Sequence, residues 1–430
     1  MQQVFVLDQS KKPLMPCHPA RARELLRRKK VAVLKLNPFT IILFNRTGGD
    51  KQPLELKFDP GSKTTGIAIV IEGGNGLKAI WGANLFHRGE SIKKGLLSRR
   101  AIRRSRRNRK TRYREPRFLN RTRPKGWLAP SLISRVDNIN NWTFKIRKLA
   151  PITSLSSELV RFDMQKLRNP EIEGVEYQQG SLFGYELKEY LLLKWKHRCA
   201  YCSKKDIPLE VEHIVPKSKG GSDSITNLTI ACSSCNQKKS NTSIEVFLKS
   251  KPSILRKIKA QTKTPLKDAA AINSIRYAII DSLKDHKLPL LFGTGGQTKF
   301  NRIKQGYKKE HWIDAVCVGS TGKNVEISEN FNPLIIKATR RGSRQMCRVD
   351  KYGFPRTASK TSKIVKGFST GDMVKAVVTK GKKIGVYFGK VAIRTSGSFN
   401  IQTKSGIVQG IGWKYCRLLQ KADGYQYMFN

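Results

Sequence analysis

Two cysteine pairs with the spacing CxxC constrain this chain more than any other feature of its sequence. Cys199 and Cys202 form the first pair, Cys232 and Cys235 form the second, and 29 residues lie between them. Four thiolates presented by two short turns suit a tetrahedral structural zinc site. The spacer is longer than that of a plain zinc ribbon, which indicates a folded element between the turns. A redox-active pair is the alternative, but two matched pairs in one basic region favour zinc.

The spacer contains a candidate catalytic centre. It begins with EVEHIVP, in which carboxylates flank His213 in a strand-like run, and continues with a Gly-rich turn and a second strand-like run, NLTIAC. A helix is expected to start at SSCNQKKSN. Phosphodiester hydrolysis needs a base for the attacking water and a cation on the phosphate oxygens. His213 is the candidate base, and Glu212 and the amide oxygen of Asn236 are candidate Mg²⁺ ligands.

A β-hairpin that leads into a helix around one metal resembles the HNH, or ββα-metal, nuclease family. The resemblance implies that His213 is the general base, that Glu212 and Asn236 hold the metal, and that Asn227 orients the loop. Many members have Asp where this chain has Glu212, and either carboxylate binds Mg²⁺.

The charge of the chain points to a polyanionic partner. It contains 84 Lys and Arg against 31 Asp and Glu, a formal net charge of +53, and nucleic acid is the usual partner of such a chain. No stretch of about 18 apolar residues predicts a membrane span, and the first residues do not resemble a secretory signal. Cys17, Cys317, Cys347 and Cys416 are scattered singly, unlike a disulfide framework. We therefore expect a cytoplasmic protein.

Carboxylates in three separated segments predict a second metal site. Asp59 ends an apolar-alternating run, Glu158 lies in another strand-like run, and His311 and Asp314 have the i, i+3 spacing of one helix face. An ordinary Asp-Pro-Gly turn remains an equal alternative for Asp59 on that segment alone. Together the four residues are the inventory for two Mg²⁺ ions that flank a scissile phosphate.

The order of these segments resembles a RuvC nuclease domain of RNase H-like fold that is split in three. The resemblance implies that Asp59, Glu158 and Asp314 are the metal ligands and that His311 is auxiliary. The HNH-like region lies between the second and third pieces. With this order of segments, the chain resembles the IscB family, whose members are compact transposon-encoded relatives of the RNA-guided type II CRISPR effectors. Residues 13–16 match the PLMP motif of that family.

Residues 88–125 form an Arg-rich segment. They hold 17 Lys and Arg against two acids, with the core SRRAIRRSRRNRKTRYR, and they predict a helix with arginines on every side. A globular core does not bury such a helix, but nucleic acid phosphates suit it. A disordered basic tail is the alternative, and the position inside the chain disfavours it. The resemblance implies a bridge helix against guide RNA, for which the candidate binding residues are Arg99, Arg100, Arg103, Arg104, Arg106, Arg107 and Arg109.

The predicted fold class is α/β multidomain: a split RNase H-like domain with an inserted Arg-rich helix and an HNH domain, followed by a small β-barrel. Short β-type runs and 21 basic against five acidic residues characterise the last part, for which the resemblance implies contact with RNA and a target-adjacent motif. The predicted domains are 1–53 (PLMP), 54–87 (RuvC-like part I), 88–130 (Arg-rich helix), 131–166 (part II), 167–250 (HNH with zinc), 251–321 (part III) and 322–430 (β-rich).

The resemblance implies an RNA-guided DNA endonuclease in which the HNH site cuts the guide-paired strand and the RuvC-like site cuts the displaced strand. Its expected cofactors are Mg²⁺ at both sites and structural Zn²⁺. Its expected partners are a transposon-encoded guide RNA and double-stranded DNA, bound by a monomer in the bacterial cytoplasm. A protein-guided HNH homing endonuclease and a non-catalytic RNA-binding protein are the rival hypotheses.

Overall fold

The computed structural model of this chain consists of two compact units. The first unit contains residues 1–158 and 278–430, and the second contains residues 159–277. The structure describes residues 2–73, 76–109, 124, 126–159, 185–262, 267–339, 347, 349–352, 354–358, 362–403 and 405–429. Among these residues no helix combines the length and apolar character that a membrane span requires.

Two predicted features fall partly outside the described residues. These are the second half of the Arg-rich segment (residues 110–123) and the boundary predicted between RuvC-like part II and the HNH domain (residues 160–184).

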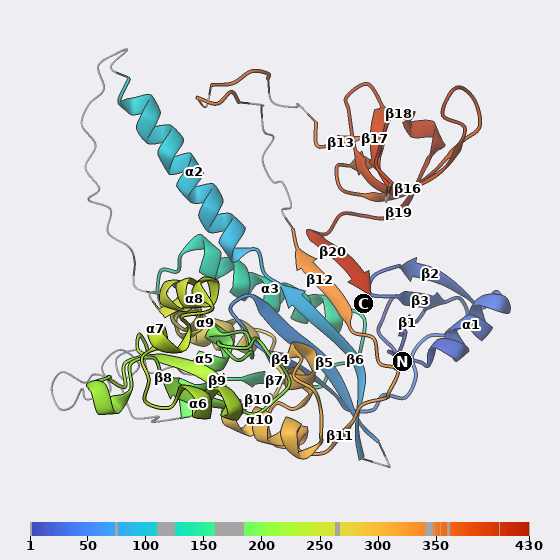
Figure 1. Cartoon of the computed structure of the whole chain (residues 1–430). Helices are drawn as coiled ribbons and strands as arrows, with labels where there is room; N and C mark the ends of the chain where they lie inside the picture. Colours follow the sequence, from blue (N-terminus) through green and yellow to red (C-terminus); the bar gives the residue numbers. More distant parts are fainter. Residues whose placement is uncertain are drawn as a thin grey trace. The chain divides into compact units, whose positions relative to one another are not determined.

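An eight-stranded mixed sheet forms the centre of the first unit (Figure 1). Its strand order is β10-β7-β4-β5-β6-β12-β20, with β11 also paired to β6. Strands β4, β5 and β6 are antiparallel, β7 and β10 run parallel to β4, and β12 is parallel to β6. The bounds are β4 Leu54–Asp59, β5 Thr64–Gly73, β6 Gly76–Phe86, β7 Ser154–Glu158, β10 Leu290–Gly293, β11 Val325–Glu326, β12 Leu334–Ala338 and β20 Tyr425–Phe429.

Helices cover both faces of this sheet. Trp81 and Gly82 are successive residues of β6, so they face opposite sides of the sheet. On one side the ring of Trp81 stacks on Trp142 of α3 (Pro130–Arg147), with 6.3 Å between the ring centroids. On the other side Trp312 of α11 (His311–Val316) lies over Gly82. A Cβ on Gly82 would lie 2.7 Å from the Trp312 ring, so this glycine lets α11 approach the sheet.

The N-terminal residues form a smaller αβ element. Its three-stranded sheet has the order β1-β3-β2, with β1 (Phe5–Leu7), β2 (Val31–Lys35) and β3 (Thr40–Leu43), and helix α1 (Pro19–Arg27) lies between the first two strands in sequence. Backbone and side-chain hydrogen bonds from Gln2 and Gln3 join this element to β6 of the central sheet. This element lies within the predicted PLMP domain, residues 1–53.

A five-stranded antiparallel sheet forms most of the C-terminal part. Its order is β18-β17-β16-β15-β19, which agrees with the short β-type runs expected in this part. The edge strands β18 and β19 are not neighbours in that order, so the predicted closure into a barrel stays a prediction. The bounds are β15 Met373–Val378, β16 Gly385–Ala392, β17 Ser398–Gln402, β18 Ile407–Gly412 and β19 Cys416–Gln420, with a short hairpin of β13 (Ile364–Val365) and β14 (Phe368–Ser369).

The described strands of the predicted domain 322–430 belong to three sheets: the central sheet, the five-stranded sheet and the β13-β14 hairpin. Strands β11, β12 and β20 belong to the central sheet, although the domain was expected to be one β-rich body. The aromatic side chains of Tyr425 and Tyr427 explain the position of β20, because both rings pack edge-on against Trp142. A change of hydrophobic period along the sequence does not reveal such long-range pairing.

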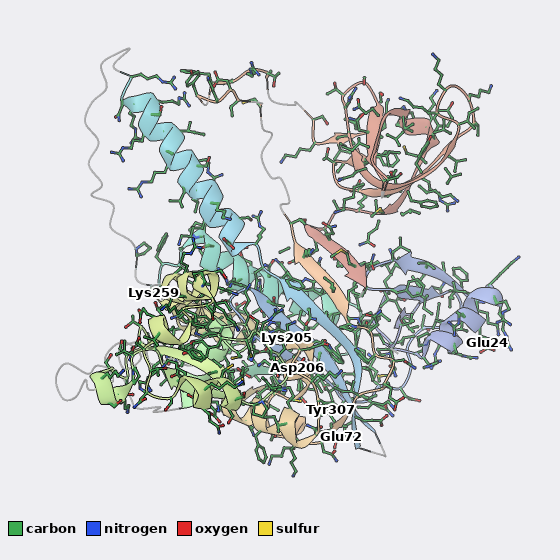
Figure 2. All side chains as sticks on the ribbon, viewed as in Figure 1. Glu24, Glu72, Lys205, Asp206, Lys259 and Tyr307 are labelled. Atoms are coloured by element: carbon green, nitrogen blue, oxygen red, sulfur yellow. The ribbon has the colours of Figure 1, made fainter. Side chains whose placement is uncertain are left out.

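The second unit contains the predicted β-hairpin and helix. Strand β8 (Leu209–His213) pairs antiparallel with β9 (Leu228–Cys232), and α6 (Ser233–Lys239) follows directly. The other α-helices among its described residues are α5 (Tyr185–Lys194), α7 (Ile244–Phe247), α8 (Pro252–Thr262) and α9 (Lys267–Lys284), and the last residues of α9, from 278 on, belong to the first unit. Figure 2 shows Lys259 on α8, which is ion-paired with Glu245 of α7 at 2.8 Å.

Candidate functional site

The four cysteines of the two CxxC pairs converge on one point. Their sulfur atoms all lie within 4.8 Å of one another, and Cys202 Sγ lies 3.8 Å from Cys232 Sγ. Thiolates that bind one zinc at about 2.3 Å in a tetrahedron lie about 3.8 Å apart. The donor set therefore fits a structural zinc ion.

Local backbone contacts bring the two cysteine turns together. The first turn closes through a hydrogen bond from Ser203 N to Cys199 O (2.9 Å), and Ala200 N donates to Ile230 O of β9 (2.8 Å). Cys232 is the last residue of β9, and Cys235 lies in the first turn of α6. A zinc ion at this point would fasten the start of the region to the strand and helix that follow His213.

Asn227 closes the loop that follows His213. Its side-chain oxygen accepts from Val215 N (2.8 Å), and its Nδ2 donates to Val215 O (3.0 Å) and Ser222 O (2.9 Å). These three hydrogen bonds hold both ends of the loop, as an orienting role requires.

His213 lies beside a carboxylate that the sequence did not single out. Its Nε2 is 2.7 Å from Asp223 Oδ1, and Asp223 Oδ2 is 2.9 Å from the ammonium of Lys217. The hydrogen bonds from Lys217 and His213 lower the pKa of Asp223, which therefore stays ionised. The sequence signal for this contact was the presence of an Asp in the Gly-rich turn that follows His213.

The two predicted metal ligands of this region have different surroundings. Glu212 is buried, with Oε1 at 2.7 Å from the ammonium of Lys239 and Oε2 accepting a hydrogen bond from the Tyr201 hydroxyl. Lys239 also donates to the backbone oxygen of His213 (2.7 Å). Asn236 Nδ2 donates to Glu210 Oε2 at 2.8 Å. Glu212 is thus charge-compensated inside the fold, and a divalent ion would have to replace Lys239 to use its Oε1.

The predicted residues of the second site lie at one edge of the central sheet. Strands β4 and β7 are parallel with Phe58 opposite Ser157, so the next residues, Asp59 and Glu158, are neighbours at the strand ends. Helix α11 packs against β4 and β5, and the Nδ1 of His311 lies 3.5 Å from Asp59 Oδ2. We call Asp59, Glu158, His311 and Asp314 the carboxylate site.

Charges shape the carboxylate site. Burial, followed by the charge of Asp59, raises the pKa of Glu158 well above its usual value. Burial also raises the pKa of Asp314, even though Arg302 Nε (2.9 Å) and Lys309 Nζ (3.1 Å) contact its carboxylate. Closely spaced carboxylates repel one another, which raises their pKa values, and such groups are typical of sites that bind divalent cations.

The three carboxylates do not form a closed ligand group in this structure. Within the described part of the chain, only the four cysteines bring at least three metal-binding atoms within 4.8 Å of one another. Oxygen donors from Asp59, Glu158 and Asp314 have the chemistry that Mg²⁺ prefers. Strands β4 and β7 and helix α11 therefore bring oxygen donors suited to Mg²⁺ near one another, but the three carboxylates do not define a coordination geometry.

The described part of the Arg-rich segment contains helix α2 (Gly89–Arg107), in which only Gly89 is buried. Figure 2 shows side chains that project to either side of this helix, and even Leu97 is 54% exposed. At its end, the guanidinium groups of Arg106 and Arg109 stack on the ring of Phe354 at 5.3 and 4.6 Å. Among the candidate residues, Arg99, Arg100, Arg103, Arg104 and Arg107 are exposed.

Comparison with protein families gives two matches. The model of the RRXRR protein family matches residues 4–180, and that of the HNH endonuclease family matches residues 199–242. The first match includes Asp59, Glu158 and helix α2, in which residues 103–107 read RRSRR. The second includes all four cysteines and His213. These matches confirm the resemblance to IscB-type nucleases that the motifs indicated.

Comparison with solved structures finds Cas9 proteins. Streptococcus thermophilus Cas9 in complex with the AGGA PAM is 14% identical over 64% of this chain and 33% of that chain, with a TM-score of 0.23. The type II-C Cas9 of Actinomyces naeslundii is 16% identical over 43% and 27%, with a TM-score of 0.17. Such scores do not establish a common fold, and this chain spans about a third of those proteins. No curated protein matches the chain.

Proposed function

We propose that this chain, whose RRXRR and HNH regions make it a nuclease of the IscB and Cas9 type, is an RNA-guided DNA endonuclease. A guide RNA would select the sequence by base pairing, and the protein would bind backbone shape and a short adjacent motif. The HNH site would cut the guide-paired strand, and the carboxylate site would cut the displaced strand. The observation that carries the proposal is the meeting of Asp59, Glu158 and His311 from segments that flank the exposed arginine helix and the HNH unit.

The HNH region supplies a base held in one orientation. In the proposed mechanism His213 removes the proton from the attacking water. Asp223 accepts a hydrogen bond from His213 Nε2, which leaves Nδ1 as the basic nitrogen of the neutral ring. Glu212 and Asn236 would hold Mg²⁺, which supplies Lewis-acid stabilisation of the phosphate oxygens. Glu212 would exchange Lys239 for the ion, and the cysteines would hold the structural zinc.

At the carboxylate site, Asp59, Glu158 and Asp314 would hold Mg²⁺ against the second scissile phosphate. The contact with Asp59 raises the pKa of His311 although burial of the ring opposes this. A charged His311 at this point would face the phosphate of the displaced strand. We also propose that the exposed arginines of α2 bind RNA phosphates, as guanidinium groups do in pairs of parallel hydrogen bonds.

Strand-resolved cleavage tests the assignment of the two sites. The protein is purified with the RNA encoded beside its gene, and a plasmid target with each strand labelled is incubated with Mg²⁺. We expect His213→Ala to slow cleavage of the guide-paired strand by about 10²–10⁴-fold and to leave nicking of the displaced strand. Asp59→Ala should have the reverse effect. The matched control is His18→Ala, which alters an exposed histidine at the start of α1 and should cut both strands.

Three outcomes would contradict the proposal. Loss of both cuts in either single variant, with target binding intact, would contradict the assignment of one strand to each site. Specific cutting by RNA-free protein would favour a homing endonuclease. Tight RNA binding without any Mg²⁺-dependent cleavage would favour a non-catalytic RNA-binding protein. Sequencing of the co-purified RNA separates these, because guided cleavage requires one discrete RNA with a variable segment.

A further inference from the structure

Lys57 is a fully buried lysine in the strand that carries Asp59. Residues 54–59 alternate, so that Leu54, Leu56 and Phe58 face one side of the sheet and Glu55, Lys57 and Asp59 face the other. Both faces of this strand are buried, and Lys57 is 0% exposed. A buried ammonium is costly unless it is paired and hydrogen-bonded, so the partners of Lys57 indicate its role.

The ammonium of Lys57 holds the end of helix α11. It donates to the backbone oxygens of Val316 (3.2 Å) and Val318 (2.9 Å), which follow Asp314 at the end of this helix. The last carbonyl groups of a helix have no partner within the helix, so a donor from outside fixes their position. Lys57 therefore connects the strand of Asp59 to the helix of His311 and Asp314.

A second side chain holds the carbonyl groups in between. Asn301 of α10 (Gly295–Lys304) is buried, and its Nδ2 donates to the backbone oxygens of Cys317 and Gly319, both at 2.9 Å. Lys57 and Asn301 thus bind four consecutive carbonyl groups, from residue 316 to residue 319, from two different elements.

Glu55 extends the same connection to the strand of Glu158. Its Oε2 lies 3.8 Å from Lys57 Nζ, and its Oε1 accepts hydrogen bonds from Ser156 of β7 and from Thr321 at 3.0 Å. Ser156 lies directly opposite Lys57, two residues before Glu158. The pair of Glu55 and Lys57 therefore contacts all three elements that carry the carboxylates.

We propose that Lys57, supported by Glu55 and Asn301, is a positioning residue that holds Asp314 in register with Asp59 and Glu158 for metal-dependent cleavage. The inference rests on the proposed function of the carboxylate site. None of the three residues needs to touch the substrate, because they act through the backbone of residues 316–319 and through β7. An apolar residue at position 57 would fill the same space but would leave two helix-end carbonyl groups without their donor.

Strand-resolved cleavage in the otherwise unchanged full chain with its RNA tests this role. We expect Lys57→Met to slow cleavage of the displaced strand by about 10²-fold, the effect of a misplacement of about 1 Å at a reacting centre. The Mg²⁺ concentration for half-maximal cleavage of that strand should rise as well. Cleavage of the guide-paired strand and target binding should stay at the wild-type level. Lys57→Arg should restore part of the rate, because arginine also donates to carbonyl groups.

Two further variants change the other two residues of this network, Asn301 and Glu55. Asn301→Leu and Glu55→Gln should lower displaced-strand cleavage and raise the Mg²⁺ requirement in the same direction. The matched control is Lys78→Met, which removes another lysine of the central sheet from an ion pair, with Glu326 at 2.7 Å, on the exposed part of β6. It should cut both strands at the wild-type rate.

The outcomes distinguish three cases: Lys57 positions the carboxylates, Lys57 only stabilises the fold, or the carboxylate site does not cut the displaced strand. A wild-type rate and Mg²⁺ requirement in Lys57→Met would overturn the positioning role while leaving the proposed function intact. Lys57→Met could instead lose both cuts and target binding to the same extent, while Lys57→Arg, Glu55→Gln and Asn301→Leu behave like the wild type. That result would show that Lys57 has a structural role only. A wild-type protein that never cuts the displaced strand would overturn the proposed function itself, and the role of Lys57 with it.

Discussion

The two units each contain a fully buried lysine, and the two lysines differ in the carboxylate that they contact. Lys239 pairs directly with Glu212, a predicted metal ligand. Lys57 pairs instead with Glu55, which lies on the same face of β4 as the predicted ligand Asp59, four residues before it. The HNH region therefore compensates its carboxylate within the protein. The carboxylate site leaves Glu158 and Asp314 with raised pKa values.

The two regions also differ in how they are assembled. The cysteines, His213 and the residues that contact it come from one short stretch of chain, which closes on itself through the hydrogen bonds of Asn227 and the cluster of four cysteines. The carboxylate site collects residues from β4, β7 and α11, which are far apart in sequence. The first arrangement should depend on zinc, and the second on the packing of the central sheet.

Removal of the zinc ligands should have the largest effect and should separate the two sites. We expect Cys232→Ser to abolish cleavage of the guide-paired strand, because structural zinc contributes about 10–16 kcal/mol to small zinc domains. Displaced-strand nicking should remain, since no cysteine of this group lies in the first unit. Zinc content and strand-resolved cleavage are measured together.

The matched control for this variant is Cys416→Ser, which alters a half-buried cysteine of the C-terminal sheet and should keep both cuts and the zinc. Guide-paired strand cleavage by zinc-free protein at the wild-type rate would show that the two regions do not differ in this respect.

Loss of Lys239 should have the next largest effect. Lys239→Met leaves the buried carboxylate of Glu212 without its cation, a change that costs about 3–5 kcal/mol in buried ion pairs. Hydrogen exchange should therefore rise in β8, β9 and α6 and stay unchanged in the central sheet. The exposed neighbour Lys238 provides the control, because Lys238→Met removes a lysine from the same helix without breaking a buried pair.

The double variant Glu212→Gln with Lys239→Met separates the structural role of the buried pair from a role of Glu212 in metal binding. It removes both charges, so protection from hydrogen exchange should recover. Cleavage of the guide-paired strand should nevertheless stay low if Glu212 is a metal ligand. Recovery of both would show that the buried pair is purely structural.

A smaller, pH-dependent effect is expected from His87 in the first unit. Its ring nitrogens contact Thr65 (2.8 Å) and Asn138 (3.2 Å). Burial, with the nearby charges of Arg135 and His311, lowers the pKa of His87 to about 3, against 6.5 for an ordinary histidine. Between these values the unfolded chain binds a proton that the folded chain does not, so stability should fall as pH drops below 6.5.

Urea unfolding at several pH values between 4 and 8 measures this effect against His87→Asn. The variant should lose part of the pH dependence, because asparagine does not titrate, and the two proteins should differ least in slope above pH 6.5. An identical pH dependence in both proteins would mean that other groups account for the acid sensitivity of the first unit.

The sequence by itself determined the features that depend on spacing over a few residues. The two CxxC pairs predicted a four-sulfur cluster, the residues from EVEHIVP to SSCNQKKSN predicted the hairpin and helix, and the Arg-rich run predicted the exposed helix α2. The i, i+3 spacing also placed His311 and Asp314 on α11. Local hydrogen bonding and side-chain periodicity are sufficient for such features.

Only the tertiary structure decided which charged residues meet inside the fold. It buried Glu212 against Lys239, joined Lys57 to the end of α11, and moved β12 and β20 from the predicted C-terminal domain into the central sheet. These contacts join segments that are distant in sequence and depend on strand register and helix packing. A local pattern does not encode them, because a buried lysine and an exposed one read alike until their partners are known.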